Sequence, residues 1–143
     1  MSEPATLREA RERLSKAESD FRSADGLFHL EEGLALLEDV FAEAAPQHRS
    51  VASNLLSTYS KRIYDSVRNV IERDPHLPQP DLEHLFKVLL AFDIEGVELP
   101  PYARALKIDV VKRLIDFHYE GYPPEEKQKM LQQLAGRTAD DAG

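Results

Sequence analysis

The chain has 143 residues, of which 42% are hydrophobic, and its formal net charge is −8 at pH 7. This length predicts a single domain whose core needs no covalent staple, and the absence of cysteine excludes disulfides and thiolate chemistry. No segment approaches the roughly 20 consecutive apolar residues that span a bilayer, and the N-terminus lacks the apolar run of a signal peptide. We therefore expect a cytoplasmic protein with no membrane contact. Because an acidic chain repels phosphate groups, we also expect no nucleic-acid partner.

Apolar residues recur with the 3.6-residue helical period along the whole chain, and no strand pattern is present. The pattern predicts helices at about 4–22, 26–44, 49–73, 82–92, 101–119 and 124–134. We expect an all-α fold in which residues 1–136 form one domain, an orthogonal or up-and-down bundle of five to six helices. The second, third and fifth helices should form the core layer, with the fourth inserted among them. The small, polar residues 137–143 should be a disordered tail.

The first predicted helix, within residues 1–23, is amphipathic but has a narrow apolar edge. This edge consists of Leu7, Leu14 and Phe21, interspersed with alanines. We expect it to be the most loosely attached part of the domain, since so thin a stripe buries little area. It could pack on the bundle, pair with its copy in a homodimer, or receive a partner helix.

The second predicted helix has two contrasting sides, one rich in leucine and the other acidic. We expect Asp25 to be its N-cap and Pro46 to follow its end. Residues 23–47 contain no Lys or Arg. The same segment has the acidic residues Asp25, Glu31, Glu32, Glu38, Asp39 and Glu43. Phe28 lies among these acids, so it either packs beneath a neighbouring helix or is left exposed for a partner.

The third and fourth predicted helices are separated by "DPHLPQP", whose prolines cannot continue a helix. The third begins with the small polar residues of "SVASNLLSTYS", which would allow another helix to approach closely. The fourth, 82–92, should be capped by Asp81, and it is apolar on nearly all sides, which is typical of an interior helix.

The segment "IDFHYEGYPPEEK", residues 115–127, gathers a histidine, two tyrosines and several charges, and so resembles an active site at first reading. Gly121 is well placed to end the fifth helix. "PPEE" is typical of a helix start, since proline suits the first turn and acids favour the positive end of the dipole. We interpret the segment as the boundary between two helices.

Motifs for metal, cofactor and nucleophilic chemistry are absent from the chain. It has no His-x-x-x-His pair, no glycine-rich phosphate loop and no G-x-S-x-G. We expect no metal and no cofactor. The remaining enzymatic alternative is a small helical enzyme that uses His29, His84 or His118 in acid–base chemistry.

The spacing from His29 to Gly33 in "HLEEG" resembles histidine-containing phosphotransfer domains, which are helical bundles of similar size. In that family an apolar residue and a lysine stand between the histidine and the glycine. Glu31 and Glu32 occupy those positions here, and a carboxylate would repel a phosphohistidine. The resemblance covers five residues and implies a phosphorelay role for His29 as the alternative function.

The function that these patterns favour is a protein–protein interaction module, such as a regulatory subunit, an adaptor or a small chaperone, and not an enzyme. We expect it to present amphipathic helical faces to another protein with a basic surface, or to form a homodimer. The predicted partner-binding residues are Leu7, Leu14, Phe21, Phe28, Glu31 and Glu38.

Overall fold

A computed structural model describes residues 4–43, 45–94, 97–118, 123–126, 128–129 and 132–133. Within them lie the five helices α1 (Ala5–Ser19), α2 (Ala24–Glu43), α3 (Pro46–Arg73), α4 (Gln79–Leu90) and α5 (Ala103–His118), and no strand. The all-α prediction is therefore confirmed. Residues 124–126, 128–129 and 132–133 are helical too, whereas the rest of the predicted sixth helix and the predicted tail 137–143 lie outside the described residues.

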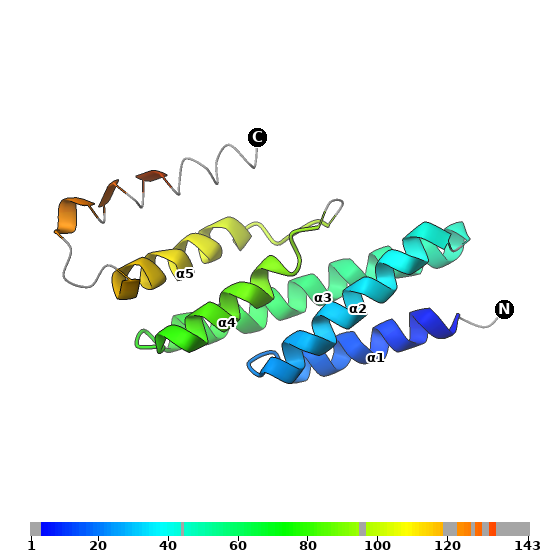
Figure 1. Ribbon diagram of the computed structural model, residues 1–143. Coiled ribbons are helices and arrows are strands. Elements are labelled where there is room, and N and C mark those ends of the chain that lie inside the picture. The colour runs from blue at the N-terminus through cyan, green and yellow to red at the C-terminus, as the bar shows by residue number, and fades with distance from the viewer. Residues whose placement is uncertain are drawn as a thin grey trace.

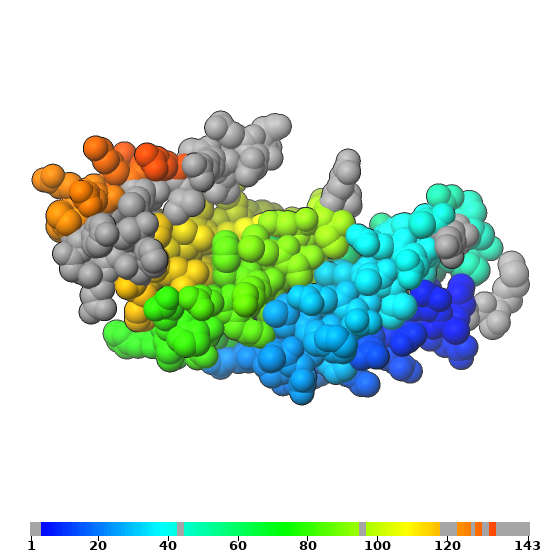
Figure 2. Space-filling view, in the orientation of Figure 1, coloured from blue at the N-terminus to red at the C-terminus, as the bar shows by residue number. Residues whose placement is uncertain are grey.

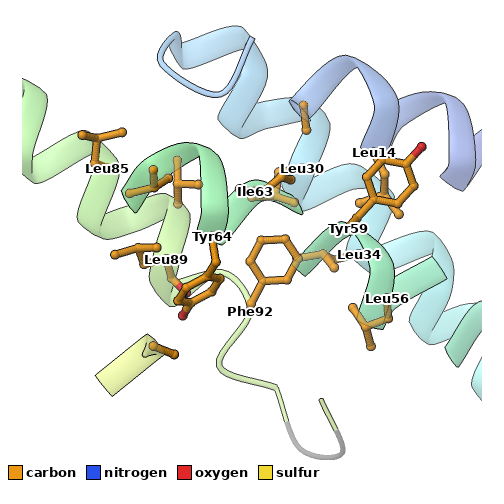
Figure 3. Close-up of a cluster of buried hydrophobic side chains, with 14 of the residues drawn as sticks. Leu14, Leu30, Leu34, Leu56, Tyr59, Ile63, Tyr64, Leu85, Leu89 and Phe92 are labelled. Atoms are coloured by element: carbon orange, nitrogen blue, oxygen red, sulfur yellow. The ribbon is translucent and has the colours of Figure 1, made fainter. Parts of the chain in front are cut away.

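The helices form an up-and-down bundle, in which each runs antiparallel to the one before it (Figure 1). Helices α1, α2 and α3 pack together at one end, and α4 lies between them and α5. Both α1 and α4 contact α2 and α3, so the α2–α3 pair forms the centre of the molecule. The core lies where these four helices meet and extends to one side of α5, and Figure 3 shows Leu30, Leu34, Ile63, Tyr64, Leu89 and Phe92 within it.

Helix α1 is a firmly packed part of the core, contrary to the expectation of loose attachment. Its buried residues follow a strict helical spacing and are Leu7, Ala10, Leu14 and Ala17. The alanines and Gly33 of α2 explain how so narrow a stripe can pack tightly. A Cβ atom on Gly33 would lie 3.1 Å from Cγ of Leu14, so the glycine lets the two helices approach closely.

Helix α5 lies at the edge of the bundle and not in a central layer with α2 and α3, as was predicted, although its Ala103, Leu106 and Val110 are buried in the core. Among the described helices it contacts only α3 and α4. Its outer end also leaves Phe117 42% exposed. The mostly apolar sequence of α5 suggested burial, but the α2–α3 pair is already covered by α1 and α4.

Two predicted helix caps are also wrong. Helix α2 begins at Ala24 and is capped by Ser23, whose Oγ accepts a hydrogen bond of 3.0 Å from the backbone N–H of Gly26. Helix α4 begins two residues before Asp81, after Pro78. Asp81 therefore lies in the first turn, where its carboxylate is 4.0 Å from the guanidinium of Arg22.

Candidate functional site

The structure divides the predicted partner-binding residues into a buried group and an exposed group. Leu7 and Leu14 have no exposed area, and Phe21 is half-buried against the core. A side chain with no exposed area cannot contact a partner, so Leu7 and Leu14 are part of the core and not of a binding surface. Phe28, Glu31 and Glu38 are exposed on α2.

Phe28 lies on the outward side of α2 and is 54% exposed, which decides between the two alternatives left by the sequence. It does not pack beneath α1. Ala35 and Ala42 follow at seven-residue intervals, so they lie on the same side of the helix, and both are exposed. Figure 2 shows α2 forming part of the outer surface, with α4 beside it.

Four exposed acidic residues flank this apolar strip. By helical spacing, one pair borders it on each side; the residues are Glu31 and Glu38, and Glu32 and Asp39. We call the set Phe28, Glu31, Glu32, Ala35, Glu38, Asp39 and Ala42 the acidic face. None of its carboxylates forms a hydrogen bond or an ion pair with another residue that the structure describes. Its negative charge is thus not neutralised locally.

His29 lies beside the acidic face, and its ring is hydrogen-bonded to the guanidinium of Arg13. Nη1 of Arg13 donates to Nδ1 of the ring at 2.9 Å, because a guanidinium has no acceptor. The ring also meets Phe28 edge-on, with centroids 6.0 Å apart. Arg13 cannot accept a proton, so this contact does not supply an acid–base pair. The phosphotransfer-like spacing to Gly33 has a structural explanation in the packing against Leu14.

The other histidine candidates do not form a site with His29. Nε2 of His84 donates to the backbone carbonyl of Phe21 at 2.8 Å and so ties α4 to the α1–α2 turn. The side chain of His118 lies outside what the structure describes. Within the described residues, no group of three or more His, Asp or Glu side chains is placed to hold a metal ion.

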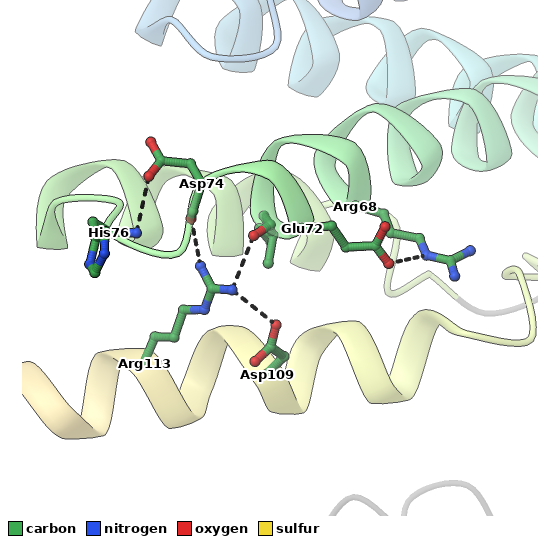
Figure 4. A network of polar contacts seen from close by, with 7 residues as sticks. Arg68, Glu72, Asp74, His76, Asp109 and Arg113 are labelled. Atoms are coloured by element: carbon green, nitrogen blue, oxygen red, sulfur yellow. Dashed lines mark hydrogen bonds and ion pairs between the residues drawn. The ribbon is translucent and has the colours of Figure 1, made fainter.

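Polar contacts between α3 and α5 serve the fold. Arg113 donates from Nη1 to the carbonyl of Asp74 at 2.9 Å and from Nη2 to that of Ile71 at 3.0 Å (Figure 4). These carbonyls are at the end of α3, where no further turn of helix satisfies them. Asp109 lies 3.6 Å from the same guanidinium, as its spacing predicts. Arg113 therefore acts as a C-terminal cap of α3.

Another polar cluster joins α3 to the start of α5. The hydroxyl of Tyr102 donates to a carboxylate oxygen of Asp65, and the guanidinium of Arg68 lies 4.4 Å from the centre of the tyrosine ring. Burial and this hydrogen bond raise the pKa of Tyr102 above its ordinary value. Such a tyrosine remains neutral at pH 7, and the cluster acts as a tether.

A cavity of about 170 Å³ lies between α2 and α3, beyond the end of α4. Its apolar walls are Leu34, Leu37, Phe41, Leu56 and Ile94. Glu38, Ser53 and Ser57 complete the lining and are all exposed, so they form its rim. Glu38 also belongs to the acidic face, which places the cavity at the border of that face.

Sequence reasoning found the acidic residues and Phe28 but missed Ala35, Ala42 and the cavity. The alanines could have been found, because they repeat at seven residues from Phe28 within an otherwise acidic surface. The cavity could not, since it depends on where α4 ends relative to α2 and α3. None of the described helices is both long enough and apolar enough to cross a membrane.

Comparison of the chain with protein-family models, curated proteins and solved structures gives no match.

Proposed function

We propose that the protein is a protein–protein interaction module, and that the acidic face of α2 binds a basic segment of another protein. The observation that carries this proposal is the exposure of Phe28 at one end of a surface with unpaired acids. An aromatic side chain in such a position has the character of an interface anchor, since anchors are buried aromatics surrounded by a polar rim.

The contribution of Phe28 to the free energy of binding can be estimated from the apolar area that a partner would bury. Burying the exposed half of a phenylalanine side chain removes about 100 Å² from water, which is worth about 2–3 kcal/mol. Ala35 and Ala42 are small, so a partner helix could approach the backbone of α2 closely beside the aromatic ring. Charge complementarity with Lys or Arg would then mainly raise the association rate and select the partner.

A second copy of the chain is a poor partner for this face. Two acidic faces brought together would place like charges opposite one another, which disfavours that pairing. Leu7 and Leu14 of the first-helix edge, which could have mediated a homodimer, are buried within one chain. The proposal is therefore a heterologous partner with a basic surface.

Capture from a lysate of the source organism, read by mass spectrometry, tests the charge requirement. The test variant is Glu31→Lys/Glu38→Lys, and the matched control is Glu125→Lys/Glu126→Lys, which makes the same charge change at exposed positions away from α2. We expect a stoichiometric partner to be retained by the wild type and the control and lost by the test variant. A partner retained equally by all three would contradict the proposal.

A further inference from the structure

The groove between α2 and α3 is only partly occupied by the chain itself. Helix α4 has 12 residues, whereas α2 has 20 and α3 has 28. The first half of α4 lies at the α1–α2 turn, as the contacts of Asp81 with Arg22 and of His84 with the carbonyl of Phe21 show. Because α4 is the shortest of the three, it ends before the groove does.

Phe92, two residues after the end of α4, fills the part of the groove next to that end. Its side chain is fully buried and lies beside Leu34 in Figure 3. The cavity of about 170 Å³ lies beyond it, where α2 and α3 continue without a covering helix. Ile94 follows Phe92 and forms one wall of the cavity, so the apolar side chains of the protein reach the cavity but do not fill it.

The dimensions of the cavity suit one side chain. Pockets for drug-sized ligands enclose about 300–1,000 Å³, while a cavity of about 150 Å³ with similar walls holds a molecule of the size of benzene. The walls of this cavity are leucine, isoleucine and phenylalanine, which offer no hydrogen bond to a polar ligand. Its occupant should therefore be a large apolar group.

The rim indicates what carries that group. Ser53 and Ser57 are one turn apart on α3, so their small side chains lie on one side of the helix and admit a close neighbour. Glu38 stands on the opposite rim, exposed and without an ion-pair partner among the described residues. A cationic residue next to the apolar group would pair with it.

We propose that this cavity receives a Leu, Ile, Met or Phe side chain of a basic amphipathic helix that binds across the acidic face, with a Lys or Arg of that helix paired to Glu38. The inference rests on the proposed function, and it adds a helical partner and the position of its anchor. In this mode of recognition an amphipathic helix binds in an apolar groove. Helix α4 packs against α2 and α3 in the same way within the chain. Since Glu38 belongs to both surfaces, one segment can reach the acidic face and the cavity together.

The test uses three synthetic 14-residue helical peptides: an amphipathic Leu/Lys peptide, its Leu/Glu counterpart, and an Ala/Lys peptide that keeps the charge but lacks an anchor. Each is titrated into ¹⁵N-labelled full-length protein while backbone amide signals are followed by NMR. We expect the Leu/Lys peptide to shift the signals of Leu34, Ser57 and Ile94, and the Ala/Lys peptide to bind at least about tenfold more weakly. That factor corresponds to about 1.4 kcal/mol.

Three variants locate the contact. Ser57→Leu fills the mouth of the cavity, and Thr58→Leu is its matched control, since Thr58 is also exposed but does not line the cavity. Ser57→Leu should weaken Leu/Lys binding about tenfold, and Thr58→Leu should leave it unchanged. Phe28→Ser tests the acidic face separately. Because residues 57 and 58 are exposed, circular dichroism should show that both variants fold.

The outcomes separate this inference from the proposed function. The Leu/Lys peptide could bind the wild type, bind Phe28→Ser more weakly, and bind Ser57→Leu with unchanged affinity. In that case the cavity is not a binding pocket, while the acidic face remains the proposed binding surface. If no basic peptide shifts the cavity signals at saturating concentration, the inference is overturned. The proposed function is then judged by the lysate capture alone.

Discussion

Tyr64 makes a long-range hydrogen bond by which a core side chain of α3 holds α4. Its hydroxyl donates to the carbonyl of Leu89 at 3.0 Å, within the buried cluster of Figure 3. We predict that Tyr64→Phe lowers the free energy of unfolding by about 1 kcal/mol, the usual value for one hydrogen bond. Urea denaturation measures it. Tyr59→Phe is the matched control, because its hydroxyl bonds no described residue, and an equal loss in both variants would contradict the assignment.

The same residue gives a prediction for alkaline pH. Burial, with a smaller contribution from the negative charge of Asp93, raises the pKa of Tyr64 above its ordinary value of 10.0. A raised pKa means that the folded state holds the proton more tightly. The contribution of Tyr64 to stability is therefore complete below about pH 10 and decreases as the pH rises further.

We predict that the free energy of unfolding of the wild type falls more steeply between about pH 10 and pH 11 than that of Tyr64→Phe. Denaturant titrations at a series of pH values give both slopes. Parallel slopes would mean that the hydroxyl ionises equally easily in the folded and unfolded chain.

At the scale of single residues, the residue types and their helical spacing predicted the exposure of some side chains correctly and that of others wrongly. The acids and Phe28 of α2 were identified from the sequence, since helical spacing alone puts them opposite the leucines. Leu7 and Leu14 were assigned to a partner because a thin apolar stripe resembles an interface edge. Leu14 packs against Gly33, which allows an approach of the two helices that periodicity does not reveal.

Arg113 joins helix α5 to the end of α3. The guanidinium bonds two backbone carbonyls, and its side chain is 23% exposed. We predict that Arg113→Gln costs about 1–2 kcal/mol, the value of charged hydrogen bonds reduced by partial solvent screening. Chemical denaturation tests this against Lys112→Gln, an exposed neighbour that should change stability by less than about 0.5 kcal/mol. Equal effects would show that the carbonyl contacts contribute nothing.

The α1–α2 turn depends on Gly26. A Cβ atom there would lie 1.8 Å from the carbonyl oxygen of Asp20, a backbone atom that cannot move alone. We predict that Gly26→Ala destabilises the protein by about 2–3 kcal/mol, despite the gain in helix propensity of about 1 kcal/mol. Thermal denaturation compares it with Gly33→Ala, whose nearest contact is the Cγ atom of Leu14 at 3.1 Å and not a backbone atom. The turn assignment is wrong if Gly26→Ala is the milder of the two.

At the scale of elements, the helices were more predictable than their ends. Periodicity located all five, because each has an apolar side that must be buried. The ends depend on local hydrogen bonds: Ser23 and Asp25 are both good caps by type, and only geometry shows that Ser23 Oγ meets the N–H of Gly26. The start of α4 was missed because prolines before it suggested a longer loop than forms.

At the scale of the whole molecule, the arrangement of helices was the least predictable feature. The mostly apolar sequence of α5 suggested a central position, but burial of a helix depends on which neighbours cover it. With α1 on the α2–α3 pair, α5 is left at the edge with Phe117 exposed. The same competition for the α2–α3 groove leaves the cavity beyond α4, so the proposed anchor site is a product of helix lengths and not of a motif.

The measurement that tests the account most directly is the affinity of the captured partner for the wild type, Phe28→Ser and Phe117→Ser, determined by isothermal titration calorimetry. Phe117 is also an exposed phenylalanine, but on α5, so the two variants remove the same side chain from different surfaces. We predict that Phe28→Ser weakens binding at least about tenfold and that Phe117→Ser changes it by less than about twofold. Equal affinities for the wild type and Phe28→Ser would contradict the assignment of the acidic face as the binding surface.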